Sequence, residues 1–201
     1  MKCFNRTRDS SKIKTQVINW EGPYAFPKFK KLNNLPALPE CSGVYLFTCD
    51  YLDDLVLYGL GITTRPFKKR LLEHRRFYFK GKYNVLDIKA LKEGLREEIW
   101  HGWQYASSHQ EEYQARKEEI SIATEKQLQQ TKIYIANIED KRIQERIEGA
   151  VAFALYSSKE AYADIIDKGM NLKGRNNSEM PIKIVNISDQ KIYGLPKELE
   201  I

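Results

Sequence analysis

The chain has 201 residues, of which 42% are hydrophobic and 30% charged, and it carries a net charge of +6. This length suits one domain of generous size, and the composition is that of a globular protein rather than a disordered one. There is no apolar run near the roughly 20 residues needed to cross a bilayer, and the first residues lack a secretory signal. The three cysteines, Cys3, Cys41 and Cys49, have no metal-ligand spacing. We therefore expect a cytoplasmic protein with free thiols and no membrane association.

The N-terminal part differs from the rest of the chain. Residues 1–40 are expected to form an irregular basic arm, because four prolines interrupt them. Residues 41–201 are expected to form the main domain, against which aromatic side chains of the arm could pack.

The first regular elements are expected after residue 42. Residues 43–48 and 55–58 are rich in β-branched and aromatic side chains and flank a polar stretch, which predicts an antiparallel hairpin. Pro66 suits the first turn of a helix, and apolar or aromatic residues then recur at helical spacing: Phe67, Leu71, His74 and Tyr78.

The second half of the chain predicts further elements. Residues 87–100 and 108–130 are expected to be helical and to lie in an insertion covering about 78–130. Residues 131–138 alternate and predict a third strand, residues 140–156 predict a helix with a buried stripe, and residues 182–185 predict a short strand. The expected fold is therefore α+β: a small, mainly antiparallel three-stranded sheet flanked by helices, with a helical insertion.

Basic residues are concentrated in residues 65–82. Eight lysines and arginines stand there against Glu73 alone: Arg65, Lys68, Lys69, Arg70, Arg75, Arg76, Lys80 and Lys82. Such a concentration suits a phosphate-binding surface, because released counterions drive binding to nucleic acid. The alternative is a surface that only keeps the protein in solution.

Several short motifs occur in a characteristic order. They are Gly43-Val44-Tyr45, Tyr58-Gly59-Leu60-Gly61, the helix containing Arg70 and His74, and Arg146-Ile147-Glu148-Gly149-Ala150. In this order, and on these elements, they resemble the GIY-YIG nuclease superfamily. The match of Tyr58 to the second motif requires one extra residue at the end of a strand, which we expect to form a β-bulge.

The resemblance implies a metal-dependent endonuclease that hydrolyses phosphodiester bonds in DNA, of the restriction or the repair type. It implies that Glu148 binds Mg²⁺ or Mn²⁺, that Arg70 contacts the scissile phosphate, and that Tyr45, with Tyr58 or His74, orients or deprotonates the attacking water. A late asparagine, Asn177 or its neighbour Asn176, would be a positioning residue. The expected DNA contacts are Arg65, Lys68, Lys69, Arg75 and Arg76.

The residues themselves support these roles to different degrees. Arg70 and His74 share a helical face, and the fork of an arginine suits a phosphate. His74 lies on the apolar stripe, so a structural histidine is a competing interpretation. Glu148 adjoins the buried stripe of its helix, where a carboxylate is costly unless a cation or a donor meets it. One carboxylate together with substrate phosphate fits a magnesium ion that keeps several waters.

Two other functions remain open from the sequence. The first is a nucleic-acid-binding module that has lost catalysis on the same scaffold. The second is an interaction scaffold in which the helices of residues 87–130 matter and the basic residues do not. The expected partner is double-stranded DNA, and the insertion is as suited to a homodimer interface as to a DNA contact.

Overall fold

The computed structural model describes residues 13–167 and 171–201. The strands are β1 (Lys14–Ala25), β2 (Gly43–Tyr51), β3 (Asp54–Thr63), β4 (Val85–Leu86), β5 (Glu98–Trp100), β6 (Lys132–Asn137), β7 (Ile182–Ser188), β8 (Ile192–Tyr193) and β9 (Glu198–Glu200). The α-helices are α1 (Lys30–Asn33), α2 (Phe67–Tyr78), α3 (Ile88–Lys92), α4 (Trp103–Ser108), α5 (Gln110–Ala115), α6 (Lys117–Gln130) and α7 (Lys141–Tyr156), and a short 3-10 helix, η2, spans Ala161–Asp164.

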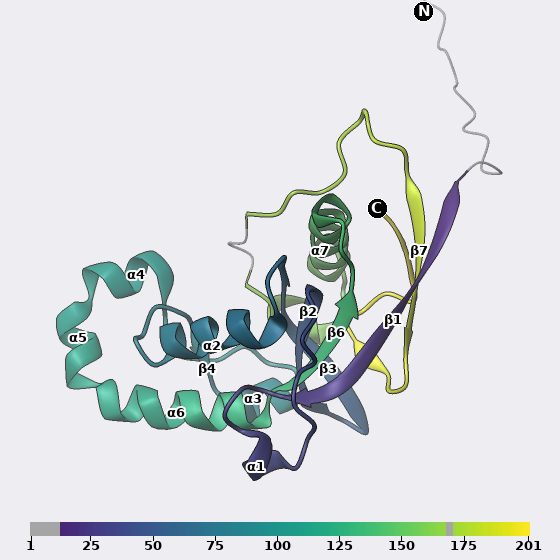
Figure 1. Ribbon diagram of the computed structural model, residues 1–201. Helices are drawn as coiled ribbons and strands as arrows, with labels where there is room; N and C mark the ends of the chain where they lie inside the picture. Colours follow the sequence, from purple (N-terminus) through teal and green to yellow (C-terminus); the bar gives the residue numbers. More distant parts are fainter. Residues whose placement is uncertain (1–12, 168–170) are drawn as a thin grey trace, which may run out of the picture.

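The main sheet is much larger than the sequence predicted. Seven strands form one mixed sheet in the order β8-β3-β2-β6-β1-β7-β9, which curls into a half-barrel, and β4 pairs with β5 in a separate small sheet (Figure 1). The expected three-stranded, mainly antiparallel sheet is therefore wrong. Only β2, β3 and β6 correspond to the three expected principal strands; β1 and the strands of the C-terminal region complete the sheet.

Strand β1 accounts for the largest error. Residues 14–25 were expected to be irregular, yet they lie inside the sheet, antiparallel to β6 and parallel to β7. Ile18 and Trp20 are each 3% exposed, and Trp20 Nε1 donates a hydrogen bond to Asn186 Oδ1 of β7 at 2.9 Å. Pro23, which argued against a strand, lies where the register with β6 shifts, and such an irregularity tolerates a residue without an N–H.

The hairpin of β2 and β3 agrees with the sequence, and so does its expected bulge. Phe47 pairs with Gly59 and Thr48 pairs with Leu57, so Tyr58 is the extra residue between two paired positions. The bulge lets Tyr58 join the aromatic side chains of β2 on one sheet face, where its ring centroid lies 6.1 Å from that of Phe47.

Helices cover both faces of the sheet near the hairpin. On one face, Tyr45 and Phe47 pack with α2 and with the insertion, and on the other face Val44 and Leu46 pack against α7. Because both faces are covered, seven consecutive residues of β2, Gly43–Cys49, are buried. Helix α7 is capped by Asp140, whose carboxylate accepts hydrogen bonds from the backbone N–H groups of Arg142 and Ile143.

The insertion is partly different from the expectation. A helix was predicted over 87–100, but α3 ends after Lys92, and Gly94 then adopts a φ of +79° that only a glycine takes readily. The predicted helix over 108–130 is divided into α5 and α6. Trp100, Ile120 and Leu128 belong to the same core cluster as Phe47, so the insertion covers a sheet face, while α4 and α5 project beyond α2 (Figure 1).

The other expected elements are present with small changes in length. Helices α2 and α7 and strands β6 and β7 occur where their periodicity predicted them. Among the described residues, no helix combines the length and apolar character needed to pass through a bilayer. Cys41 and Cys49 are free thiols, and Cys3 lies outside the described residues.

Candidate active site

The cavity with the predicted site residues lies at an open edge of the sheet. Strand β8 pairs with β3 only at Leu55 and Val56, so within the described residues no strand adjoins residues 59–62 of β3 on that side. Helix α2 covers one face of the sheet there and α7 the other. A cavity of about 270 Å³ opens at this edge. The predicted site residues that line it come from four elements: Tyr45 of β2, Tyr58 of β3, Arg70 and His74 of α2, and Glu148 of α7.

Tyr45 lies deep in this cavity and is 2% exposed. Its ring crosses Gly61 on the neighbouring strand so closely that a Cβ at that position would overlap the phenol oxygen. The Tyr45 Oη and His74 Nε2 atoms are 3.0 Å apart, and their rings meet edge to face with centroids 5.8 Å apart. The glycine of the second motif is thus what allows the phenol to reach His74.

Burial sets the protonation states of this pair. It raises the pKa of Tyr45 above its usual value, although the charge of Arg70 opposes the rise. Burial, together with Arg70, lowers the pKa of His74 to about 3, so the imidazole is neutral near pH 7. In the tautomer protonated at Nδ1, His74 Nε2 accepts the hydrogen bond that the Tyr45 hydroxyl donates.

Arg70 lies at the rim of the cavity with its side chain 30% exposed. Its Nη1 atom is 3.7 Å from a carboxylate oxygen of Glu73. Arg65 holds that same carboxylate with two hydrogen bonds of 2.7 Å. The Arg70 guanidinium lines the cavity and also opposes the rise of the Tyr45 pKa, both by its charge and by a side-chain hydrogen bond.

Glu148 faces the cavity from α7 and is half-buried. Its carboxylate has no hydrogen-bond or ion-pair partner among residues 13–167 and 171–201. Burial raises its pKa to about 7, the nearby Glu145 adds to the rise, and Arg70 opposes it. A carboxylate in this state is costly to ionise until a cation meets it.

The metal expected from the resemblance fits this residue. Within the described part of the chain there is no group of three or more His, Cys, Asp or Glu side chains that could hold an ion. A single unpartnered carboxylate nevertheless suits Mg²⁺ or Mn²⁺, which are commonly bound through one or two carboxylates together with water and substrate phosphate. Glu148 is the residue that would hold the ion.

Tyr58 lines the same cavity, but its hydroxyl is already engaged. The Oη atom lies 2.6 Å from Thr131 Oγ1, and this pair is buried. Burial raises the pKa of Tyr58 well above its usual value. Its ring therefore shapes the cavity wall, while its hydroxyl ties β3 to the start of β6.

The late asparagines lie outside the cavity. Asn176 and Asn177 are exposed in the loop between η2 and β7. Asn176 forms a local turn, because its Oδ1 atom accepts hydrogen bonds from the backbone N–H and the hydroxyl of Ser178. The structure does not bring either asparagine to Tyr45, Arg70 or Glu148.

The predicted DNA contacts have different surroundings. Lys69 and Arg76 are exposed on α2, and Lys68 has a side chain that is 59% exposed. The guanidinium of Arg75 instead lies over the rings of Phe29 and Phe79, at 5.7 and 4.7 Å from their centroids. A second hollow adjoins the cavity at Arg70 and Ile62 and adds Arg65 and Lys141 to the basic rim.

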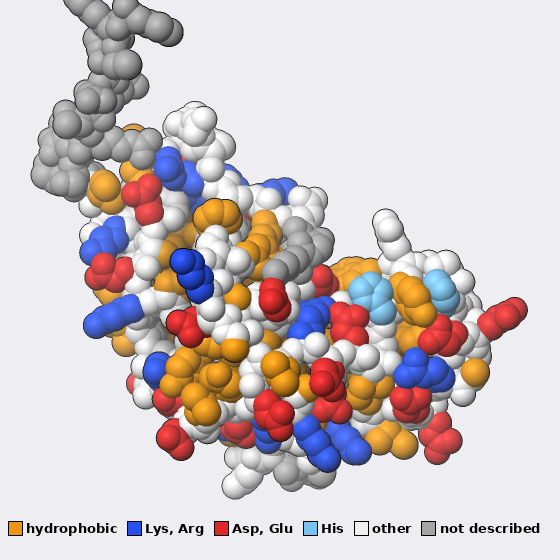
Figure 2. Space-filling model, turned by 180° about the vertical axis from the view of Figure 1, so that it is seen from behind, with side chains coloured by type: hydrophobic (Ala, Val, Ile, Leu, Met, Phe, Trp, Pro, Cys, Tyr) orange, Lys and Arg blue, Asp and Glu red, His pale blue; other side chains and the backbone are white. Residues whose placement is uncertain are grey.

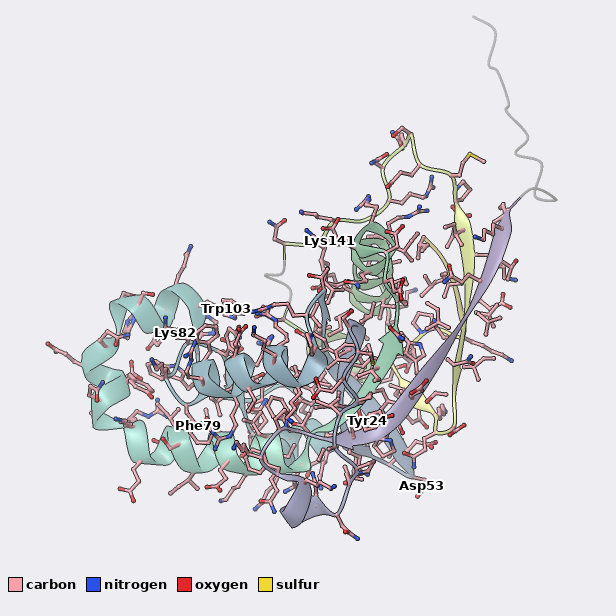
Figure 3. The ribbon with its side chains drawn as sticks, in the orientation of Figure 1. Tyr24, Asp53, Phe79, Lys82, Trp103 and Lys141 are labelled. Carbon is pink, nitrogen blue, oxygen red and sulfur yellow. The ribbon has the colours of Figure 1, made fainter. Side chains whose placement is uncertain are left out.

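Basic and acidic side chains are mixed on one face of the molecule. On the face seen in Figure 2, lysines and arginines are interspersed with aspartates and glutamates, without a continuous basic area. Lys141 stands at the start of α7 beside the second hollow, and its Nζ atom is 3.9 Å from a carboxylate oxygen of Glu145 (Figure 3).

Several residues that line the cavity were missed by the sequence analysis. Tyr83, Asn84 and Trp103 come from the insertion and form a further part of the cavity wall. Figure 3 places Trp103 above α2, on the side toward α7. The only signal in the sequence was the density of aromatic residues in this part of the insertion, which is equally typical of a hydrophobic core.

Comparisons with known proteins add no relative. The chain matches no protein-family model, and searches of curated proteins and of solved structures also gave no match.

Proposed function

We propose that this protein is a metal-dependent endonuclease that hydrolyses phosphodiester bonds in DNA. The observation that supports it is the convergence of Tyr45, Arg70, His74 and Glu148 on one cavity from three separate elements. A hydrogen-bonded phenol and imidazole, an accessible guanidinium and an unpartnered carboxylate are together the groups that phosphoryl transfer with water requires.

Each side chain has a defined part in this proposal. Tyr45 directs its own proton toward His74 Nε2, so its oxygen can accept hydrogen bonds on its other side, from Arg70 and from the attacking water. Arg70 donates to the non-bridging oxygens of the scissile phosphate, where negative charge develops. Glu148 would hold the divalent ion, which supplies Lewis-acid stabilisation of the phosphate and the leaving oxygen.

The surroundings favour an extended polyanion as substrate. Exposed Lys68, Lys69 and Arg76 follow α2, and the hollow with Arg65 and Lys141 continues past Arg70 on the other side. These positive charges can contact phosphates on both sides of the scissile bond.

Incubation with supercoiled plasmid tests the proposal directly. Wild-type protein should nick the plasmid with Mg²⁺ or Mn²⁺ and not with EDTA. Glu148→Gln should bind DNA and not cleave it, and Glu139→Gln, which changes an exposed carboxylate just before α7, should cleave normally. Cleavage by Glu148→Gln at the wild-type rate would exclude the metal role. If the wild-type protein binds DNA without a metal ion and never cleaves it, the inactive nucleic-acid-binding module would be favoured.

A further inference from the structure

One half of the cavity is not used by the proposed mechanism. Its wall is built by Tyr83 and Trp103 of the insertion, whose ring centroids are 5.0 Å apart. The Tyr83 ring also lies 5.2 Å from the ring of His74, which connects this wall to the catalytic cluster. Any group held against Tyr83 and Trp103 is therefore a neighbour of the group held by Tyr45 and Arg70.

Trp103 is unusual among the tryptophans. Its side chain is 55% exposed, whereas Trp20 and Trp100 are 3% and 1% exposed. Its backbone has a φ of 54°, a conformation that costs a bulky residue free energy and persists where the surroundings fix it. Three contacts do so: Trp103 N donates to Lys82 O at 2.9 Å, Trp103 Nε1 donates to Asp167 Oδ2 at 3.0 Å, and Gly102 lies against the backbone of Tyr83.

The polar groups beside this wall are already engaged with each other. Asn84 Oδ1 accepts a hydrogen bond from the Gly102 N–H at 2.7 Å, and Arg96 bonds to Glu98 and to the carbonyl of Ile165. The wall thus offers aromatic faces rather than a set of free donors and acceptors. This is the chemistry of base stacking, which tolerates any base, and not of hydrogen-bonded sequence reading.

We infer that Tyr83 and Trp103 stack on an unpaired base of the DNA, next to the scissile phosphate. This inference rests on the proposed function and names its substrate: DNA with unpaired nucleotides at the cleavage site rather than continuous duplex. A base within a duplex must first be unstacked and unpaired, which costs a few kcal/mol, and a base in a gap or flap avoids that cost. The basic residues along α2 then hold the adjoining backbone.

Binding without cleavage provides the test. In EDTA, a duplex is compared with the same duplex carrying a short single-stranded gap, and tryptophan fluorescence is recorded. Because Trp20 and Trp100 are buried, quenching by gapped DNA should come from Trp103 and should disappear in Trp103→Phe. Trp103→Leu should weaken binding of gapped DNA at least about fivefold, the lower end of the effect of losing one stacked base, and leave duplex binding unchanged. Phe153→Leu, which alters another exposed aromatic side chain outside the cavity, should change neither.

The outcomes separate this inference from the proposed function. Magnesium-dependent cleavage combined with equal binding of both DNAs, and no effect of Trp103→Leu, would overturn the stacking role alone. Preferential, Trp103-dependent binding of gapped DNA without any cleavage would support the stacking role and overturn the nuclease. Tighter Trp103-dependent binding of RNA of the same sequence would overturn the assignment of DNA as the ligand. If Trp103→Leu fails to fold, Trp103→Phe still provides a test. Binding of gapped DNA by Trp103→Phe without fluorescence quenching would support stacking.

Discussion

Glu145 and Glu148 lie one turn apart on α7 and differ in what surrounds them. Burial opposes ionisation of Glu145, but Arg142 and Lys173 outweigh it and lower the pKa of that carboxyl. Glu148 has no such partners in the part of the chain that the structure describes, and burial raises its pKa to about 7. The same residue type on the same helix is therefore a salt-bridge partner at one position and a candidate metal ligand at the other.

The raised pKa of Glu148 predicts how activity depends on pH. A divalent ion binds the ionised carboxylate, so at low Mg²⁺ concentration the cleavage rate should rise with pH through about 7. More Mg²⁺ should move the midpoint to lower pH, because the ion competes with the proton. Glu145→Gln should also move it to lower pH, since the charge of Glu145 contributes to the rise. Initial cleavage rates between pH 5.5 and 8.5 at several Mg²⁺ concentrations measure the midpoint. A midpoint that does not change with the Mg²⁺ concentration would contradict the role of Glu148.

Arg70 gives a second prediction at the residue scale. Arg70→Lys keeps the charge but loses the planar fork that can contact two phosphate oxygens at once. Cleavage should fall on the order of a hundredfold, the usual cost of losing a hydrogen-bond donor in a transition state. Arg76→Lys, on an exposed position of the same helix, is the matched control: it keeps the positive charge that a contact with the DNA backbone needs and should cleave at close to the wild-type rate. A fully active Arg70→Lys enzyme would show that Arg70 acts only as a surface charge.

At the scale of elements, the β2–β3 hairpin builds the floor of the cavity. Its bulge places Tyr58 on the same face as Tyr45, and Gly61 leaves room for the Tyr45 ring to cross β3. Both features follow from single residues in the second motif. The hairpin therefore sets the position of the phenol before α2 and α7 contribute their side chains.

Gly61→Ala tests the close crossing of strand and ring. The added methyl group would overlap the phenol oxygen of Tyr45 and push it away from His74, so cleavage should fall at least about tenfold, as small displacements of reacting groups commonly cause. Gly174→Ala is the matched control, because a Cβ there has no neighbour within 4 Å, and it should leave the rate unchanged. Cleavage rates of both variants are compared, with circular dichroism to verify folding. Equal cleavage rates of Gly61→Ala and Gly174→Ala would show that Tyr45 takes no part in the reaction.

Tyr58→Phe tests whether the second tyrosine is chemical or structural. The variant removes the hydroxyl that bonds to Thr131 but keeps the ring in the cavity wall. The free energy of unfolding should fall by about 1 kcal/mol, the typical worth of one hydrogen bond, while cleavage stays within a few-fold of wild type. Urea unfolding and plasmid cleavage measure the two effects. A loss of cleavage activity without a loss of stability would show that the Tyr58 hydroxyl takes part in the reaction.

At the scale of the whole molecule, β1 links the central strands of the sheet to the strands of the C-terminal region. It connects β6, which belongs to the core around the site, with β7 and β9 of the C-terminal region. The ring of Trp20 packs in the core shared with α7, and its N–H bonds to Asn186. The position of α7, and with it that of Glu148, thus depends on a strand close to the N-terminus.

Trp20→Ala should therefore destabilise the entire fold. Removing a buried tryptophan usually costs about 3–5 kcal/mol, and here a hydrogen-bonded asparagine also loses its partner. Phe153→Ala, which truncates a side chain that is 70% exposed, should change the free energy of unfolding by less than about 0.5 kcal/mol. Denaturant titration of both variants compares them. A small effect of Trp20→Ala would mean that residues 14–25 act as a dispensable arm after all.

The sequence by itself determined the elements whose signals are local. Apolar residues at helical spacing predicted α2 and α7, alternation predicted β6, and two β-rich runs around a polar turn predicted the hairpin. The bulge at Tyr58 was predicted from the one extra residue by which the second motif departs from that of the family it resembles. The grouping of Tyr45, Arg70, His74 and Glu148 was expected only because their motifs resembled a family, since no local pattern links residues so far apart.

Only the tertiary structure decided the features that depend on distant neighbours. Strand β1 has a weak local signal, because prolines in and after it are typical of irregular structure. It forms because β6 and β7 supply hydrogen-bonding partners on its two sides. Glu145 forms ion pairs with Arg142 of its own helix and with Lys173 of the loop before β7, and neither pairs with Glu148. The low pKa of His74 and the raised pKa of Glu148 both follow from burial, and burial is a property of the packed chain. The aromatic wall of Tyr83 and Trp103 is likewise visible only once the insertion folds back over the sheet.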